Sequence, residues 1–443
     1  MTVKEPAWPS AGTPKLALAL VALTSLTAAF AGLPLAWDGS YFLFRVLNEQ
    51  SPLLTNVHNR LLLGILTFPV FLASQLTENF GILRFVFSLS YAAVPFVALA
   101  CCWIVVRRRP DLFVWPTLGI CVALLPGSVL FVSEALIVAE LSWPLLLAAL
   151  VPGQPRSGVV ICIVLGVVVA VSHPVALPLL LAVAVVGAVV RRRSWRAAVL
   201  WAISFTGLAA LNVVELTSRL TSFERESLEP STAAIGLARG IVGLPIAALL
   251  LVTLTAFLIY RGARSTPEAR RIELQNLALV TLLFVALTLL IWAAVPAFWR
   301  GEIDFRGWAI PLTLPLFALA WLDARVARAS DVALAGRRMR LAWAAAAVMF
   351  LVIAIQGVVW MQLVTRVSSA QAGGNGCTVA ESIEGFPDSA LGHWAITPLS
   401  ILLQARDVRA FVAPGALCEA SDWPRQVPMG PVPALTPGWF RFQ

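Results

Sequence analysis

The stretch LAWDGSYFLFRVLNEQ, residues 35 to 50, follows directly on about twenty apolar residues. A helix that crosses a membrane needs about 20 predominantly apolar residues. The run at 15–36 therefore predicts a first membrane span. The residues after it place Asp38 beside a tryptophan, a glycine and a tyrosine, so the stretch predicts a polar site where this span reaches water.

The composition of the whole chain agrees with a membrane protein. Of its 443 residues, 59% are hydrophobic and 12% are charged, and the mean hydropathy is +0.86. Soluble domains are about 25% charged. Long apolar runs indicate helices, because the strands of membrane barrels alternate in polarity. We predict an all-α polytopic membrane protein with the lipid bilayer as its partner. The net charge of +9 comes from arginines between apolar runs, so we expect no nucleic-acid partner.

The apolar runs predict 11 membrane spans, at 15–36, 82–106, 111–132, 135–152, 158–172, 175–190, 197–215, 239–260, 275–297, 309–324 and 341–362. Basic clusters lie between them, at 107–109, 191–196, 261–271 and 325–340, in addition to Lys4 and Lys15. Cytoplasmic loops carry an excess of Lys and Arg. A cytoplasmic N-terminus and an exterior C-terminus satisfy every cluster. We treat the first run as a retained helix, because it lacks a small-residue cleavage site.

One apolar run does not fit this orientation. If residues 61–76 crossed the membrane, the cluster at 107–109 and every later cluster would move outside. We therefore expect 61–76 to lie along the outer membrane surface. The alternative is that it spans and another span has been miscounted.

This orientation divides the chain into a membrane domain, 1–362, and an exterior cap, 363–443. The loop 37–81 of the membrane domain is then exterior. The tail contains Cys377 and Cys418, and two cysteines in an exterior segment predict a disulfide rather than two free thiols.

Residues capable of chemistry gather on the exterior side. The sequence has no P-loop, no zinc-protease motif, no Cys-x-x-Cys motif and no nucleophile-elbow motif. The exterior segments contain all three histidines. Their polar residues are Asp38, Arg45, Glu49, His58, Arg60, Glu134, His173, Glu215, Arg219, Glu224, Arg225, Glu226, Arg300, Glu302, Asp304, Arg306 and His393. The sequence therefore predicts an active site at the exterior membrane surface.

The segment from 35 to about 90 resembles the opening of the GT-C glycosyltransferases, such as protein O-mannosyltransferases and the lipid A aminoarabinose transferase. In that superfamily an acidic residue opens a long exterior loop with helices along the membrane, and the second span follows. The counterparts here are WDGSYFLFRVLNE, SPLLTNVHNRLLLGILTFPVFLASQL and TENFGILRFVFSLS. The resemblance covers about 60 residues and the general topology.

The resemblance implies an inverting transferase that moves a sugar from a polyprenyl phosphate to a hydroxyl of a lipid, glycan or protein acceptor. Asp38 is then the catalytic base, and Arg306 or Arg300 binds the donor phosphate. Glu134, His58 and His173 are candidates for binding the acceptor or a metal. No cofactor is certain, and a divalent cation, Mg²⁺ or Mn²⁺, stays open at Glu134. Further polar candidates are Glu302, Asp304 and Tyr41.

Simpler roles exist for these residues. Asp38 is also a suitable helix cap, Arg306 a suitable interfacial anchor, and Glu134, His58 and His173 ordinary loop residues. The alternative functions are a transporter or flippase of lipid-linked or small solutes, a membrane acyltransferase that uses His173, and a scaffold subunit. The spans look nearly free of charge, which favours an enzyme over a transporter. The Arg, Ala, Val and Leu content predicts a bacterial inner membrane, with a periplasmic exterior.

Overall fold

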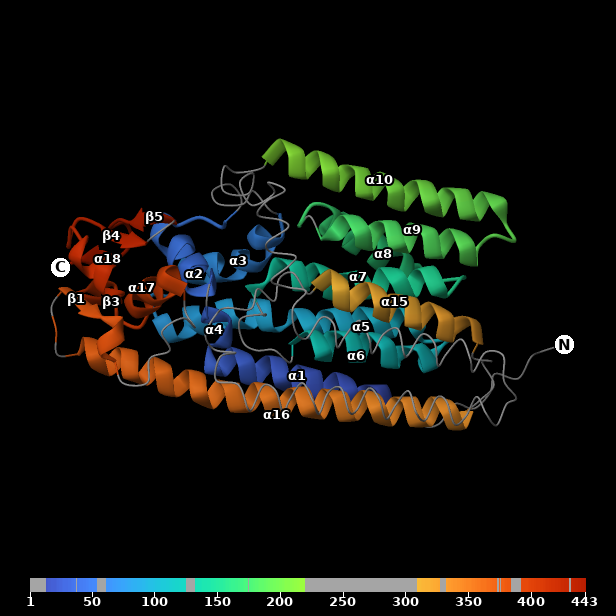
Figure 1. Ribbon diagram of the computed structural model, residues 1–443, viewed down its shortest axis with the longest axis horizontal. Coiled ribbons are helices and arrows are strands. Elements are labelled where there is room, and N and C mark those ends of the chain that lie inside the picture. The colour runs from blue at the N-terminus through green and yellow to red at the C-terminus, as the bar shows by residue number, and fades with distance from the viewer. Residues whose placement is uncertain are drawn as a thin grey trace.

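The structure is a computed structural model, which describes residues 13–36, 38–53, 61–124, 132–173, 175–219, 309–326, 332–372, 374, 376–383, 392–429 and 432–443. It is an elongated helical bundle with a small mixed unit at one end (Figure 1). The bundle consists of helices that run along the long axis, and the small unit is the C-terminal tail.

The helices of the bundle coincide with the apolar runs. They are α1 Thr13–Ala31, α4 Phe80–Ala92, α5 Val94–Val106, α6 Val114–Leu124, α7 Glu134–Leu150, α8 Arg156–Ala170, α9 Ala176–Val190, α10 Trp195–Arg219, α15 Ala309–Val326 and α16 Val332–Gln371. Such runs form helices because the backbone in lipid must satisfy its own hydrogen bonds. Each expected span that the structure describes contains helix. The expected spans 239–260 and 275–297 lie outside the described residues.

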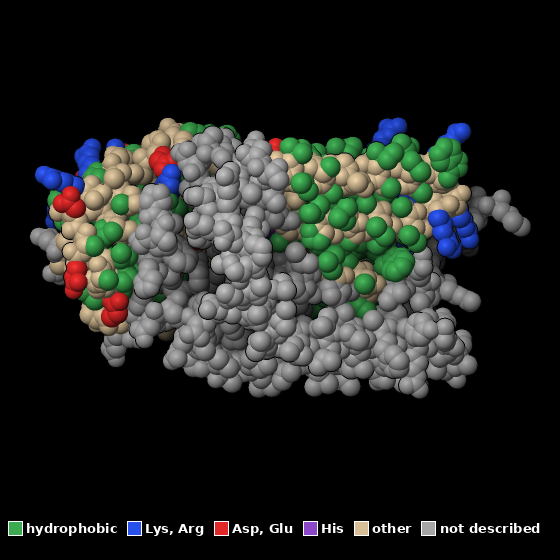
Figure 2. All heavy atoms as spheres, turned by 45° about the horizontal axis from the view of Figure 1, so that its top comes forward, with side chains coloured by type: hydrophobic (Ala, Val, Ile, Leu, Met, Phe, Trp, Pro, Cys, Tyr) green, Lys and Arg blue, Asp and Glu red, His purple; other side chains and the backbone are tan. Residues whose placement is uncertain are grey.

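Four helical segments are long and apolar enough to cross a membrane: Pro14–Ala31, Phe80–Val106, Trp195–Glu215 and Met339–Gln371. Shorter apolar helices cover Leu61–Ser74, Arg156–Ala170 and Ala176–Val190. These findings support a helical membrane protein, and the total of eleven spans stays a prediction. The outward faces of the bundle are apolar, as expected for helices that contact lipid, because Ile163, Val185 and Leu200 are each more than 60% exposed. Figure 2 shows such side chains covering this face, with charged side chains gathered toward its two ends.

The second expected span is built from two helices, α4 and α5. Asn79 caps α4, since its Oδ1 accepts the amide of Ile82 at 3.2 Å. Pro95 lies in the first turn of α5, where its missing amide hydrogen costs no helical bond. The span therefore begins two residues earlier than the expected 82 and contains a junction at Ala93.

The last helix is longer than expected. The apolar run predicts 341–362, but α16 contains 40 residues and continues to Gln371. At 1.5 Å per residue this helix is about 60 Å long. It leads from the bundle into the tail (Figure 1), so the chain has no break at the expected domain boundary of 362. The helix continues past 362 because residues 363–372 contain no glycine or proline, and the Gly-Gly-Asn-Gly sequence follows Ala372.

The turns that contain arginine lie together at the end of the bundle away from the tail (Figure 1). Arg108 after α5 donates to the carbonyl of Gly153, in the turn between α7 and α8, at 3.2 Å. Arg191 after α9 donates to the carbonyls of Ala148 and Ala149 at 3.0 and 2.9 Å. The described clusters thus share one end, as the positive-inside rule requires. The compartment that this end faces stays a prediction.

At the tail end, α2 Asp38–Glu49 and α3 Leu61–Ser74 follow the short 3-10 turn η1 Leu33–Leu35. Helix α3 contains 14 residues and packs on α2 and α4. It is shorter than the about 20 residues that a perpendicular crossing requires. Its expected position along the membrane surface stays a prediction.

The tail departs from the all-α expectation, because it contains short strands. Strand β1 Gly376–Val379 pairs in parallel with β3 Ala410–Ala413, β2 Asp407–Val408 in parallel with β6 Arg441–Phe442, and β4 Val427–Met429 antiparallel to β5 Val432–Leu435. Helices α17 Gly392–Leu402 and α18 Gly415–Glu419 complete the unit, with 3-10 turns at Pro110–Phe113 in the bundle and Ala380–Ser382 in the tail. The apolar stretches here are only a few residues long and are divided by prolines and glycines, which favours strands over helices.

The tail packs on α2 and on the start of α4. The ring of Phe440 stacks on Phe44 of α2 at 5.0 Å and contacts Phe80 of α4 at 5.7 Å. Arg406 forms an ion pair with Glu78 at 2.8 Å. The tail therefore covers α2 and the start of α4, which lie at the two ends of the loop that the sequence predicts to be exterior.

Candidate functional site

Asp38 lies in the first turn of α2, where it is half-buried. The chain turns sharply just before it, because η1 is followed by Ala36 with an extended backbone. Residue 39, which follows Asp38, must be glycine. A Cβ atom on Gly39 would lie 1.7 Å from the carbonyl oxygen of Pro34 and 3.3 Å from Cγ1 of Val132. This close packing fixes the position of Asp38 against the turn that precedes α7.

Two further elements meet Asp38. Its carboxylate interacts electrostatically with the hydroxyl of Tyr91 at the end of α4. The neighbouring Ser40 donates its hydroxyl to the carbonyl of Ala395 in α17 at 2.8 Å. The acidic residue named from the sequence thus stands where α2, α4, the entrance to α7 and the tail come together.

Tyr41 has a local partner. It is 3% exposed, and its hydroxyl accepts a hydrogen bond from Arg45 at 2.8 Å. Arg45 also pairs with Glu49 one turn later. Burial lowers the pKa of the Arg45 guanidinium, but the hydrogen bonds to Glu49 and Tyr41 outweigh it, so the pKa is raised overall. These three residues form a network along one face of α2.

Glu134 is the first residue of α7 and is 8% exposed. A carboxylate in the first turn of a helix is favoured by the helix dipole. It follows Val132, the residue that contacts Gly39, so the structure brings the Glu134 turn and the Asp38 turn to the same end of the bundle. Its predicted role in binding an acceptor or a cation stays a prediction.

His173 lies between α8 and α9 and is half-buried. Its Nδ1 accepts the amide of Val175 at 3.2 Å, and its carbonyl accepts the side-chain amide of Asn212 at 3.1 Å. The neutral ring then carries its proton on Nε2. This arrangement ties the ring to the backbone at the start of α9, and the acyltransferase alternative that uses His173 stays a prediction.

Other predicted site residues lie outside the described residues. These are His58, Arg300, Glu302, Asp304 and Arg306, and the side chain of His393. Within the described ranges no three His, Cys, Asp or Glu side chains gather as a metal group would require. The expected divalent cation stays an open prediction.

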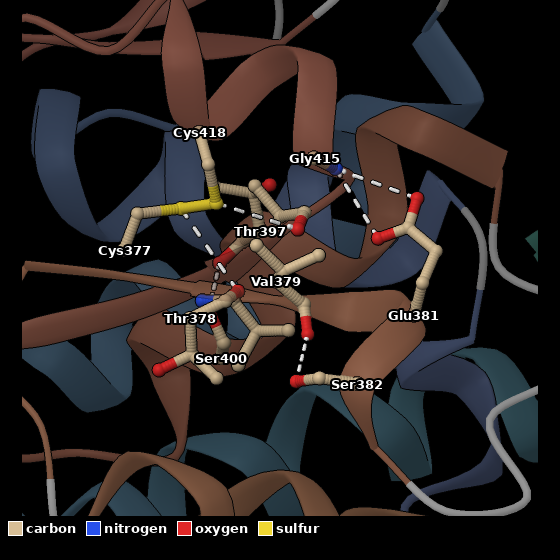
Figure 3. The surroundings of a disulfide bond; sticks show 11 residues. Cys377, Thr378, Val379, Glu381, Ser382, Thr397, Ser400, Gly415 and Cys418 are labelled. Atoms are coloured by element: carbon tan, nitrogen blue, oxygen red, sulfur yellow. Dashed lines mark hydrogen bonds between the residues drawn. A yellow bond between two sulfur atoms is a disulfide. The ribbon is translucent and has the colours of Figure 1, made fainter.

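The predicted disulfide is present. Cys377 of β1 is bonded to Cys418 of α18, with the two Cα atoms 5.5 Å apart. In Figure 3 the bond lies beside Thr397 of α17, and on the other side of α18 the carboxylate of Glu381 accepts the amide of Gly415 at 3.2 Å. The bond therefore joins the first strand of the tail to a helix 41 residues later.

Sequence reasoning missed three residues of the membrane helices. Arg84 and Tyr91 are seven residues apart, and this spacing places both on one face of α4. Arg84 is half-buried, and no carboxylate of the described chain pairs with it. Glu140, in the middle of α7, is 3% exposed, so the spans are less free of charge than expected. The signal available in the sequence was an ionisable residue inside an expected span.

A second polar group lies at the opposite end of the bundle. Arg109 holds Asp111 through two hydrogen bonds of 3.0 and 2.8 Å, which raise the pKa of its guanidinium. Trp115 donates its indole N–H to Asp323 of α15 at 2.8 Å. The contact of Trp115 with Asp323 joins α6 to α15, and the contact of Arg109 with Asp111 is local to the turn before α6.

The arrangement at the tail end offers the carboxylate of Asp38 and the hydroxyl of Tyr91 at one junction, and the guanidinium of Arg45 lies on the same helix as Asp38. Such a set can accept a proton and bind a polar or anionic group. No protein-family model, curated protein or solved structure matches this chain.

Proposed function

We propose that the protein is an inverting glycosyltransferase that uses a polyprenyl-phosphate-linked sugar at the tail end of its bundle. The observation that carries the proposal is the position of Asp38. This carboxylate stands at the junction of α2, α4, the α7 entrance and the tail cap. The similarity of residues 35–90 to the GT-C opening supports the same assignment.

In the proposed reaction Asp38 accepts the proton of the acceptor hydroxyl. The hydroxyl oxygen forms a bond to the anomeric carbon, and the bond from that carbon to the phosphate oxygen breaks. The electron pair leaves with polyprenyl phosphate, so the configuration at the anomeric carbon inverts. A carboxylate within hydrogen-bond reach of the acceptor contributes about 10²- to 10⁴-fold to such a step.

The leaving phosphate requires positive charge. Arg306 and Arg300 are proposed to supply this charge to the donor phosphate. Arg84 is a third candidate, and its position is described by the structure. Its guanidinium donates to the carbonyl of Phe80 at 3.3 Å through Nε, which leaves the fork of its terminal nitrogens available. A divalent cation at Glu134 remains part of the proposal for charge on the phosphate.

The test is transfer of radiolabelled sugar from a panel of polyprenyl-phosphate sugars in membranes, with the wild type compared with Asp38→Asn. The asparagine keeps the shape but cannot take a proton. Glu419→Gln is the matched control, because Glu419 is exposed on α18. The proposal predicts transfer by wild type and control and loss of about 10²-fold or more in Asp38→Asn. Transfer by Asp38→Asn at the wild-type rate would show that Asp38 is only a helix cap.

A transporter or flippase is the second candidate, and Glu140 is the observation that favours it. Ionisable residues inside a membrane bundle mark ion or substrate pathways. Reconstituted vesicles that carry wild type or Glu140→Gln test this function by translocation of a fluorescent polyprenyl-phosphate lipid. Translocation by the wild type and its loss in Glu140→Gln, without sugar transfer by either, would replace the transferase with the transporter.

A further inference from the structure

Exposed arginines gather at the end of the bundle away from the tail, where the turn between α9 and α10 lies (Figure 1). They occupy this turn and the first turns of α8 and α10, and we call them the arginine rim: Arg156, Arg192, Arg193 and Arg196. Among the described residues no carboxylate forms an ion pair with any of them. Figure 2 shows basic side chains at this end of the bundle, beside a hydrophobic face.

Two further arginines hold the turns of the rim together. Arg191 donates to the carbonyl of Ala149, at the end of α7, at 2.9 Å and interacts electrostatically with Cys162 of α8. Arg108 donates to the carbonyl of Gly153, just before α8, at 3.2 Å. The start of α8 and the turn between α9 and α10 are therefore both fastened around the end of α7. The arginines of the rim belong to one surface, although they come from different parts of the sequence.

Helix stability does not account for the charge of the rim. Arg156 is the first residue of α8, and Arg196 is the second residue of α10. The N-terminus of a helix carries a partial positive charge, so a cation in its first turn is unfavourable. The positive-inside rule explains why arginines stand in such turns, but it predicts no preference for one lipid over another in the folded protein. A bound anion would offset the repulsion between these arginines.

Exposed apolar side chains continue from the rim along the same helices. Val160 follows Arg156 by four residues and is 58% exposed, and Leu200 follows Arg196 by four residues and is 67% exposed. Residues four apart lie on one face of a helix. Trp195 is 69% exposed beside the rim, and tryptophan is enriched where a membrane meets water. A ligand of this surface therefore meets positive charge at one end and hydrocarbon along its length.

The two parts of this surface select the ligand. A guanidinium keeps its charge and binds a phosphate through two parallel hydrogen bonds. A zwitterionic phospholipid carries its own cation and gains less from such a site, whereas an anionic phospholipid gains fully. Free phosphate would use the arginines but would leave the apolar faces of α8 and α10 without a function.

We propose that the arginine rim binds the headgroup phosphate of an anionic phospholipid, such as phosphatidylglycerol, whose acyl chains lie along the exposed faces of α8 and α10. The partner is a lipid of the leaflet that this end of the bundle contacts. The proposal does not rest on the proposed function, because the rim and Asp38 lie at opposite ends of the bundle (Figure 1).

The experiment measures dissociation constants of single lipids for the purified full chain in neutral detergent, by native mass spectrometry. The probes are phosphatidylglycerol, phosphatidylcholine with the same acyl chains, and glycerol phosphate as the headgroup without acyl chains. The variant replaces Arg156 and Arg196 by glutamine. The matched control replaces Arg409 and Arg425, two exposed arginines of the tail, by glutamine. In detergent the orientation of the chain in a membrane has no influence on the result.

The wild type and the control are expected to bind phosphatidylglycerol more tightly than phosphatidylcholine. The rim variant should lose about fivefold of this preference for each arginine removed, the equivalent of about 1 kcal/mol each. Its affinity for phosphatidylcholine should not change, and glycerol phosphate should not displace the lipid from the wild type. Thermal denaturation shows whether the double variant is folded, and Arg156→Gln alone, compared with Arg425→Gln, gives the same test with a smaller change.

Other results overturn the proposal. If the folded rim variant keeps the full preference for phosphatidylglycerol, these arginines only orient the chain during insertion. If the tail control loses as much preference as the rim variant, the net charge of the protein attracts the lipid rather than the rim. If glycerol phosphate displaces the lipid at the same ionic strength as a chloride control, the site takes a free anion. A wild type without any preference also refutes the proposal.

Discussion

Replacing Gly39 by alanine should displace the start of α2 and with it Asp38. The new Cβ would lie 1.7 Å from the carbonyl oxygen of Pro34 and 2.9 Å from its carbon. Contacts below 3.0 Å essentially do not occur for real Cβ atoms, so the two backbone segments must separate by about 1.3 Å or more. Both partners are backbone, so no side-chain rotation relieves the contact. Overpacking of this kind costs about 1–3 kcal/mol.

The expected effect on activity is larger than the effect on stability. A misplacement of about 1 Å at a catalytic group reduces the rate by on the order of 100-fold. We therefore expect Gly39→Ala to lower sugar transfer by about 100-fold while the chain stays folded, measured with the radiolabelled donor and by thermal denaturation in detergent.

The matched control is Gly207→Ala on α10. A Cβ atom there meets nothing within 4 Å, and alanine is the better helix former by about 0.8–1 kcal/mol. This variant should be at least as stable as the wild type and fully active. If Gly39→Ala behaves like Gly207→Ala in both assays, the packing of the Asp38 turn is not what positions the carboxylate.

Three further predictions concern stability. Replacing both Cys377 and Cys418 by serine should destabilise the tail by about 4 kcal/mol, because the unfolded chain regains the entropy of a loop of 41 residues. Limited proteolysis should then cleave the tail faster while the bundle stays intact. An unchanged rate of cleavage would contradict the prediction. Asn212→Leu removes the donor to the carbonyls of Ala170 and His173, at 2.8 and 3.1 Å, and should cost about 1–3 kcal/mol in thermal denaturation; an unchanged melting temperature would show that the α8–α10 contact is unimportant. Trp115→Phe leaves the buried carboxylate of Asp323 without its indole donor and should cost about 1.5–3 kcal/mol, whereas no loss would mean that water replaces the indole.

The sequence determined the helical membrane character of the protein and the position of its helices. Apolar runs such as 135–152 and 175–190 were found within two residues of α7 and α9, because the requirement for internal backbone hydrogen bonds in lipid is local to each segment. It also determined the pair Cys377 and Cys418, since those were the two cysteines outside the expected spans. It identified Asp38 as a candidate site residue, because the composition changes from apolar to polar directly after the first span.

Only the tertiary structure decided which polar groups meet. Tyr91 and Trp360 are distant along the chain and lie inside apolar runs, where nothing local distinguishes one packing position from another. Helices α4 and α16 both pack against η1 before Asp38, which brings Tyr91 close to that carboxylate and Trp360 close to Gly32. The parallel pairing of β1 with β3 and of β2 with β6 was likewise decided only in the folded chain. A short apolar stretch takes its form from the surface that it covers, and that surface exists only when the chain is folded.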